Sequence, residues 1–194
     1  MDGGHAVEEH YGSVEFDLPS VLAQLDGHTP AECRDAVETV QTHVAENPDA
    51  CLPTVPKLRT LLEQPDVDCQ ADAAYCLAEL AEHSPVDVAP SADELATFVA
   101  ERPGHAATPA LIRSLAAISS DRPDALVDHV DALDTALESD APEARAASAT
   151  ALGRLATETD ATVDPVRDRL AALAADDPDS AVRERAAAAL ERFP

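Results

Sequence analysis

The chain has 194 residues and carries 38 acidic against 13 basic side chains, a formal net charge of −25. This charge opposes binding to nucleic acid or to an anionic membrane, because both require a basic protein surface, so we expect neither as a partner. Hydrophobic residues make up 45% of the chain but aromatic residues only 3%, and alanine is about a fifth, which favours an all-α protein with closely packed helices.

Residues 1–18 precede the first periodic segment and are predicted to form an N-terminal extension that is partly mobile or capping. Tyr11, Val14, Phe16 and Leu18 are expected to lie across the first helix pair as a cap. The extension has neither the basic start nor the apolar core of a secretory signal. No apolar run approaches the ~20 residues that span a bilayer. We therefore expect a cytoplasmic protein whose four cysteines are reduced.

From residue 19 onward, two families of amphipathic helices alternate with a period of 37 or 38 residues. The apolar anchors of the first helices are Val21, Leu58, Leu95, Leu133 and Leu170. The anchors of the second helices are Val40, Leu77, Leu115, Leu152 and Leu190. Further apolar or small residues follow at helical spacing, so each helix has one buried face. The predicted hairpins cover about 19–46, 50–83, 90–120, 123–158 and 161–193.

Paired helices at this period resemble HEAT repeats. The pattern is most typical in the last two second helices, EARAASATALGRLA (143–156) and SAVRERAAAALERF (180–193), which combine small residues with arginine. The period is also close to that of armadillo arrays. The resemblance covers about residues 19–194. It implies a right-handed α-α superhelix, a solenoid of about five HEAT-like hairpins with the second helices on its concave side.

The composition is that of proteins from salt-loving archaea: arginine outnumbers lysine twelve to one, and carboxylates are in large excess. At molar salt the Debye length is ~3 Å, so the self-repulsion of such a chain is screened. An acidic mesophilic protein is the alternative. The chain resembles the phycobilisome-lyase (PBS-lyase) HEAT-like repeat family, haloarchaeal type. Members of that group include adaptors that link chemotaxis signalling to the motility apparatus.

No catalytic, cofactor-binding or metal-binding residue is predicted. Cys69 and Cys76 share a helical face, but within the repeat they take positions of small buried side chains, and no C-x-x-C is present. The segment HAVEEH (5–10) fits neither H-E-x-x-H nor H-x-x-E-H. A P-loop, a G-x-G-x-x-G and a G-x-S-x-G are also absent from the sequence. We therefore expect a protein that is not an enzyme and uses no cofactor.

Outward positions of the second helices change from acidic to basic along the chain. The first 97 residues carry 3 basic and 20 acidic side chains, the remaining 97 carry 10 and 18. The predicted partner-binding groove comprises Tyr75, Arg113, Arg154, Arg185 and Arg192. Such a polarised groove would orient a protein partner, for example an acidic or amphipathic helical segment. The alternative is a solvated face on which the arginines balance nearby acids.

Arg145 and Arg183 follow acidic turns that contain Asp140, and Asp177 with Asp179. We expect them to be structural partners of these turn carboxylates rather than ligand contacts.

The sequence thus favours a non-catalytic interaction scaffold or adaptor that binds another protein on its concave face, in signalling or motility if it shares the role of the haloarchaeal adaptors. The alternative is a lyase-like enzyme or enzyme subunit that handles a tetrapyrrole-type cofactor. That alternative needs a cavity beside Tyr75 lined by aromatic residues and histidine. We expect a monomer, or a weak homodimer formed through the C-terminal end.

Overall fold

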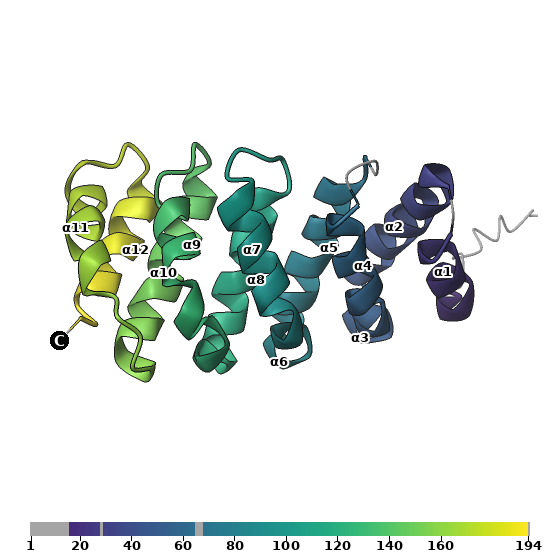
Figure 1. Ribbon diagram of the computed structural model, residues 1–194, viewed down its shortest axis with the longest axis horizontal. Helices are drawn as coiled ribbons and strands as arrows, with labels where there is room; N and C mark the ends of the chain where they lie inside the picture. The colour runs from purple at the N-terminus through teal and green to yellow at the C-terminus, as the bar shows by residue number, and fades with distance from the viewer. Residues whose placement is uncertain (1–15, 28, 65–67, 194) are drawn as a thin grey trace, which may run out of the picture.

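A computed structural model of the chain describes residues 16–27, 29–64 and 68–193. Regular structure within these ranges is helical throughout, without a strand. The helices follow one another in an elongated array from α1 (Leu18–Leu25) to α12 (Ser180–Leu190), which lie at opposite ends (Figure 1). The all-α solenoid expected from the sequence is therefore confirmed. Among the described helices, none combines the length and apolar character that a membrane span requires.

The second helix of each hairpin is unbroken. These helices are α2 (Pro30–Val44), α5 (Gln70–His83), α8 (Thr108–Asp121), α10 (Pro142–Glu158) and α12. At the start of α2, Thr29 and Glu32 form a reciprocal capping box. At the start of α12, the side chain of Asp179 accepts hydrogen bonds from the backbone N–H groups of Ala181 and Val182. Both caps satisfy donors that a helix end leaves without a partner.

After α1, the first helices are broken near their starts. The second and third hairpins begin with a single helical turn and a 3-10 turn: α3 (Pro48–Cys51), η1 (Leu52–Thr54) and α4 (Val55–Leu62), then α6 (Pro85–Val88), η2 (Ala89–Ser91) and α7 (Ala92–Glu101). The fourth and fifth begin with a 3-10 segment: η3 (Pro123–His129) and α9 (Val130–Ala136), then η4 (Asp164–Val166) and α11 (Arg167–Asp176). Pro53 and Pro90 lie inside the 3-10 turns, because proline lacks the N–H that would continue the α-helix.

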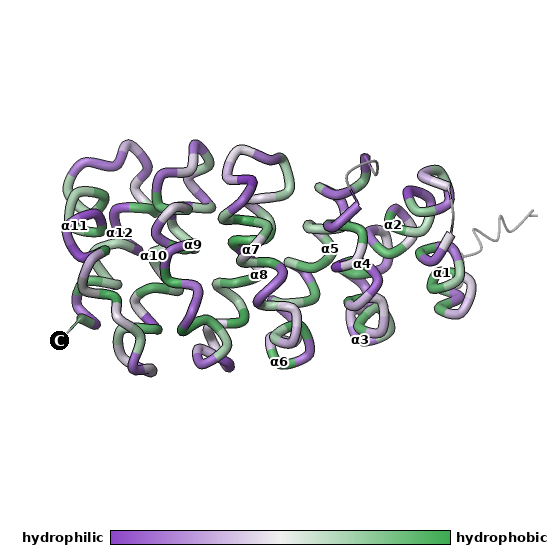
Figure 2. The backbone as a smooth tube through the Cα atoms, in the orientation of Figure 1, coloured by the Kyte–Doolittle hydropathy of each residue, from purple (hydrophilic) through white to green (hydrophobic). Residues whose placement is uncertain are grey.

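The core lies between the two rows of helices. All five first-helix anchors are buried, and so are four of the second-helix anchors, from Val40 to Leu152. Leu190 is half-buried because α12 has a second-helix neighbour on one side alone within the described chain. Figure 2 shows hydrophobic segments recurring on each helix, while the loops at the upper edge of the view are mostly hydrophilic. The register of the repeat is the one that the anchor spacing predicts.

In the fourth hairpin, the position four residues before the second-helix anchor holds a polar residue inside this core. Ser148 stands where the other second helices carry alanine or leucine, and it is fully buried. Its hydroxyl donates a hydrogen bond to the backbone carbonyl of Leu133 in α9. The serine is therefore satisfied, and it ties the two helices of its hairpin together.

The second helices approach one another closely because small residues line their contacts. A Cβ added to Gly153 in α10 would lie 2.8 Å from the Cα of Ala189 and 2.9 Å from its Cβ, in α12. These distances are shorter than van der Waals contact, so the glycine sets the spacing of the two helices here. The first helices contact their neighbours in the first row much less.

At the N-terminal end, Tyr11 and Val14 of the expected cap lie outside the described residues. Phe16 is partly buried against the core, and its ring lies 5.1 Å from the ring of His43 in α2. Leu18 opens α1 and is half-buried. The two described members of the predicted cap thus contact or begin the first hairpin.

Arg145 and Arg183 have structural partners, as expected, but not all of the expected ones. Arg145 pairs with the buried carboxylate of Asp177, through contacts of 2.8 and 2.9 Å to its two oxygens. To Asp140 it donates a hydrogen bond at the backbone carbonyl, at 3.2 Å, and not at the carboxylate. Arg183 donates to the backbone carbonyls of Asp177 and Pro178. Arg145 thus has a turn carboxylate as its partner, although the one in the next turn, whereas for Arg183 the expected carboxylate partner was wrong, because its guanidinium reaches the nearest backbone carbonyls instead.

Candidate functional site

The outward side chains of α2, α5, α8, α10 and α12 form one surface, which we call the second-helix face. The outward positions of these helices, which lie five and two residues before each anchor and two residues after it, are exposed or half-buried in the structure, and none is buried. Because the second helices pack directly against their neighbours, these positions follow one another from helix to helix without interruption by a first helix. The face combines exposed acids near α2, such as Asp35 and Glu38, with arginines from α8 onward.

A hollow of about 400 Å³ opens on this face between α8 and α10. Its lining residues are Glu82, Pro85, Arg113, Ala116, Ala117, Ser120, Ala146, Ala147, Thr150, Arg154 and Arg185. Four alanines, whose methyl groups we call the alanine floor, and three arginines are among these residues. The structure therefore brings together Arg113, Arg154 and Arg185, three of the five residues predicted for the groove.

Arg113 is already paired within the protein. Its guanidinium lies 2.9 Å from a carboxylate oxygen of Glu79 and 2.7 Å from one of Glu82, both in α5. Burial opposes the charged form, but the hydrogen bonds to Glu79 and Glu82 outweigh it and raise the pKa of Arg113. Arg113 thus connects α5 to α8, and its charge is compensated before any partner arrives.

Arg154 is held by neutral groups. Its Nη1 donates to the backbone carbonyl of Ala116 at 2.7 Å and to the hydroxyl of Ser119 at 3.0 Å, both in α8. Burial lowers the pKa of Arg154, as do the nearby charges of Arg192 and Arg185. The nearby carboxylates of Glu158 and Asp121 act in the opposite direction, and the guanidinium remains charged at any ordinary pH.

Arg185 and Arg192 complete this group at the C-terminal end of the face. Arg185 is exposed on α12, and no carboxylate of the described residues lies within 4 Å of either Arg185 or Arg154. Arg192 follows α12 and lies 4.0 Å from Glu158, a distance at which an exposed pair contributes little. We call Arg154, Arg185 and Arg192 the arginine cluster.

Tyr75, the fifth predicted residue, is 36% exposed on α5. It belongs to the same face but is not among the residues that line the hollow. The hollow is also lined by no histidine and no aromatic residue. The arrangement that a tetrapyrrole site requires beside Tyr75 is therefore not the one formed here.

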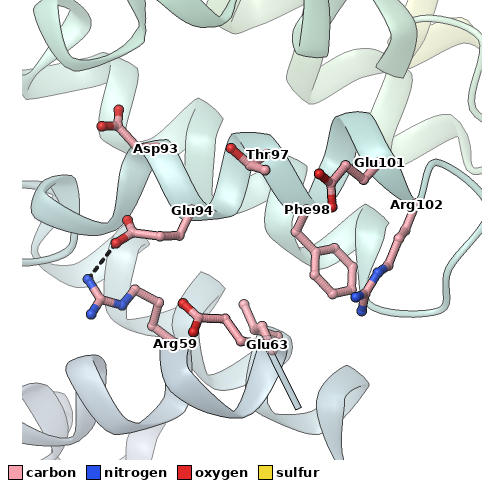
Figure 3. Close-up of a pocket in the computed structure, with 9 residues that line it drawn as sticks. Arg59, Glu63, Asp93, Glu94, Thr97, Phe98, Glu101 and Arg102 are labelled. Carbon is pink, nitrogen blue, oxygen red and sulfur yellow. Dashed lines mark ion pairs between the residues drawn. The ribbon is translucent and has the colours of Figure 1, made fainter. Parts of the chain in front are cut away.

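A second hollow, of about 410 Å³, lies on the opposite row between α4 and α7 (Figure 3). Arg59 pairs with Glu94 across it at 2.9 Å, and the guanidinium of Arg102 lies 4.8 Å from the centre of the Phe98 ring. This hollow was not predicted from the sequence, because the outward positions of the second helices alone were taken as a candidate surface. A signal was available: Arg59 and Glu94 occupy nearby positions in successive first helices.

The four cysteines, Cys33, Cys51, Cys69 and Cys76, are buried and free. Burial raises the pKa of each thiol, and that of Cys76 to about 12. These thiols are protonated at neutral pH, which suits packing better than nucleophilic chemistry or metal binding. Among the described residues, no three histidine, cysteine or acidic side chains are placed to hold a metal. The HAVEEH segment lies outside the described residues.

The stacked hairpins and the continuous second-helix face define a helical repeat protein of the solenoid class. No family model matches the sequence, and no curated protein matches it. Several solved structures are similar to the chain in fold. Two engineered proteins of the Northeast Structural Genomics Consortium are each 24% identical, with TM-scores of 0.71 and 0.69; the alignments cover 89% of this chain and 77% and 78% of theirs.

A designed armadillo repeat protein, solved in complex with the peptide (KR)4, is similar as well. It is 16% identical with a TM-score of 0.69, and the alignment covers 90% of this chain and 80% of the designed protein. At these identities the similarity concerns the fold. The chain is therefore similar to helical repeat proteins of armadillo-like architecture in its backbone arrangement.

Proposed function

We propose that the protein is a non-catalytic scaffold or adaptor that binds another protein on its second-helix face. The observation that carries the proposal is the open hollow between α8 and α10, lined by the alanine floor and three arginines, in the middle of a continuous helical surface. A hollow with a methyl floor admits a helix or an extended segment at close range. We also propose that the second helices line the concave side of the array, because they pack against one another more closely than the first helices do.

The comparison with the designed armadillo repeat protein supports the same class of function, because that protein was solved with a peptide bound. We further propose that the repeats, over residues 19–194, are HEAT-like and of the haloarchaeal PBS-lyase type. The pattern of small residues and arginine on α10 and α12 supports this assignment, while the short helices α3 and α6 add a third helical segment to the second and third hairpins. The acidic, lysine-poor composition supports a protein that works at molar salt.

Two further parts of the proposal concern the cellular compartment and the oligomeric state. Four buried, unpaired thiols favour a reducing compartment, and we propose a cytoplasmic protein. The last hairpin has a second-helix neighbour on one side alone within the described residues, and we propose a monomer or at most a weak homodimer formed through the C-terminal end. Neither nucleic acid nor membrane is proposed as a partner, and no cofactor is required for binding.

The test is position-specific photo-crosslinking in extract of the native cells at molar KCl. A benzoylphenylalanine replaces Ala147, which lines the hollow, or Ala172, which is exposed on α11 in the first row. The proposal predicts a discrete protein adduct from position 147 and none from position 172. Adducts from position 172 alone, or equally from both, would contradict the assignment of the face.

A further inference from the structure

The arginine cluster is a local excess of positive charge on a strongly negative chain. Elsewhere in the described residues, carboxylates compensate most basic side chains. Ion pairs of this kind join Arg34 to Asp68, Lys57 to Asp26, Arg59 to Glu94, Arg122 to Asp124, Arg145 to Asp177 and Arg169 to Asp134 and Glu138. Within the arginine cluster, by contrast, the one ion pair is the 4.0 Å contact of Arg192 with Glu158, and Arg154 and Arg185 have no ion pair with a described residue, although acids outnumber bases 38 to 13 in the chain.

The geometry of the cluster suits the binding of a ligand from outside. The bonds to Ala116 and Ser119 hold Arg154 in place and leave the rest of its donors for a partner. Arg185 is exposed and has no ion pair with a described residue. Arg192 lies beside α10, the helix that carries Arg154, since its Cδ is 3.5 Å from the position that a Cβ would take at Gly153. The cluster therefore presents guanidinium donors from two neighbouring second helices.

The hollow itself offers no competing negative charge. Glu82 is the one carboxylate among its lining residues, and it is already paired with Arg113. The alanine floor has no polar side-chain group that a partner would need to satisfy. The free charge of the site is therefore positive, and guanidinium groups bind carboxylates in bidentate fashion.

We propose that the arginine cluster binds the carboxylates of an acidic helical segment of a partner protein, with the apolar side of that segment on the alanine floor. This inference rests on the proposed function and names the chemistry of the partner. Arg113 takes no direct part, because Glu79 and Glu82 already occupy it. At molar salt, where the Debye length is ~3 Å, long-range repulsion between the acidic segment and the chain is screened, and contact pairs persist.

The experiment uses three synthetic probes and the full-length protein in 1 M KCl. The first probe is an alanine-rich helical peptide with four glutamates at i, i+4 spacing; in the second and third, glutamine or lysine replaces the glutamates. Binding is followed by NMR of the arginine Nε–Hε resonances and by fluorescence anisotropy. The variants are Arg185→Glu, Arg185→Gln and, as a control with the same change of charge, Arg34→Glu. Circular dichroism checks the helix content of each variant.

The proposal predicts that the glutamate peptide shifts the resonances of Arg154 and Arg185 and leaves those of Arg34 and Arg122 unchanged. The glutamine peptide binds at least tenfold more weakly. Arg185→Glu weakens binding of the glutamate peptide at least tenfold and Arg185→Gln somewhat less, whereas Arg34→Glu changes it by no more than about twofold.

Equal binding of the glutamate and glutamine peptides, or no effect of Arg185→Glu, would overturn the proposal. So would inorganic phosphate that shifts the same resonances as strongly as the peptide, because the site would then bind anions in general. Light scattering that shows peptide-sensitive dimers would assign the site to a second copy of the chain. If position 147 still forms its protein adduct while the glutamate peptide fails, the inference about acidic partners fails and the proposed function stands.

Discussion

The two rows of helices achieve the same burial in different ways. The second helices are continuous, contact one another through small residues, and leave Gly153 no room for a Cβ. The first helices after α1 are broken by turns, two of which contain a proline, and they touch their neighbours little. The second row therefore fixes the spacing of the repeats, and the continuous face that it presents is the better template for recognition.

The largest expected effect is the loss of a central anchor. Leu115→Ala in α8 removes a fully buried side chain between α5 and α10 and should lower the free energy of unfolding by about 2–5 kcal/mol. Leu95→Ala in α7 should fall at the low end of that range, because broken helices relax more easily around a cavity. Denaturant titration at molar KCl measures both. A larger loss at Leu95 would reverse the comparison of the two rows.

The next prediction compares the loss of a buried ion pair with the loss of an exposed one, in free energy of unfolding. Arg145→Ala leaves the carboxylate of Asp177 buried without its partner and should cost about 3 kcal/mol. Arg59→Ala removes a pair between α4 and α7 whose side chains are about a third exposed, and should cost no more than about 1 kcal/mol. Equal costs in thermal or denaturant unfolding would show that the link between turns does not stabilise the second row.

A smaller effect tests the helix spacing directly. Gly153→Ala should destabilise the protein by about 1–2 kcal/mol, since overpacking costs ~1–3 kcal/mol and the gain in helix propensity returns up to ~1 kcal/mol. Gly104→Ala is the matched control: nothing lies within 4 Å of the added Cβ, so stability should change by less than about 0.5 kcal/mol. A stabilising Gly153→Ala would mean that α10 and α12 are further apart than described.

The smallest effect is a dependence on pH. The hydrogen bond from Arg145 lowers the pKa of Asp177 below its ordinary value, so this carboxylate stabilises the fold above the unfolded pKa of ~3.9. That contribution is lost as the pH falls through the lower, folded pKa. The difference in unfolding free energy between the native chain and Asp177→Asn should therefore shrink from about pH 6 to about pH 3. A difference that stays constant would contradict the assigned pair.

Periodicity alone predicted much of the fold. The anchors recur at 37 or 38 residues, and side chains at that spacing fall at equivalent buried positions, as Leu77, Leu115 and Leu152 do. The breaks in the first helices could not be placed in this way. Proline both opens and interrupts helices, and the sequence does not say whether a turn of helix precedes it, as it does at Pro53 and Pro90.

The sequence predicted which arginines share the site but not which of them form ion pairs. The outward register brought Arg113, Arg154 and Arg185 to one hollow. Which arginine is compensated depends on distances between helices of different units, and a periodic pattern contains no such distances. Glu79 and Glu82 lie 34 and 31 residues before Arg113, and the structure alone shows that both reach it.

A charge-swap cycle between Arg185 and the glutamate peptide tests most directly whether the second-helix face recognises an acidic partner. The four combinations of the native chain or Arg185→Glu with the glutamate or lysine peptide give one coupling energy at 1 M KCl. We expect Arg185→Glu to weaken the binding of the glutamate peptide and to strengthen that of the lysine peptide, with a coupling energy of at least about 1.5 kcal/mol. A coupling indistinguishable from zero would contradict it.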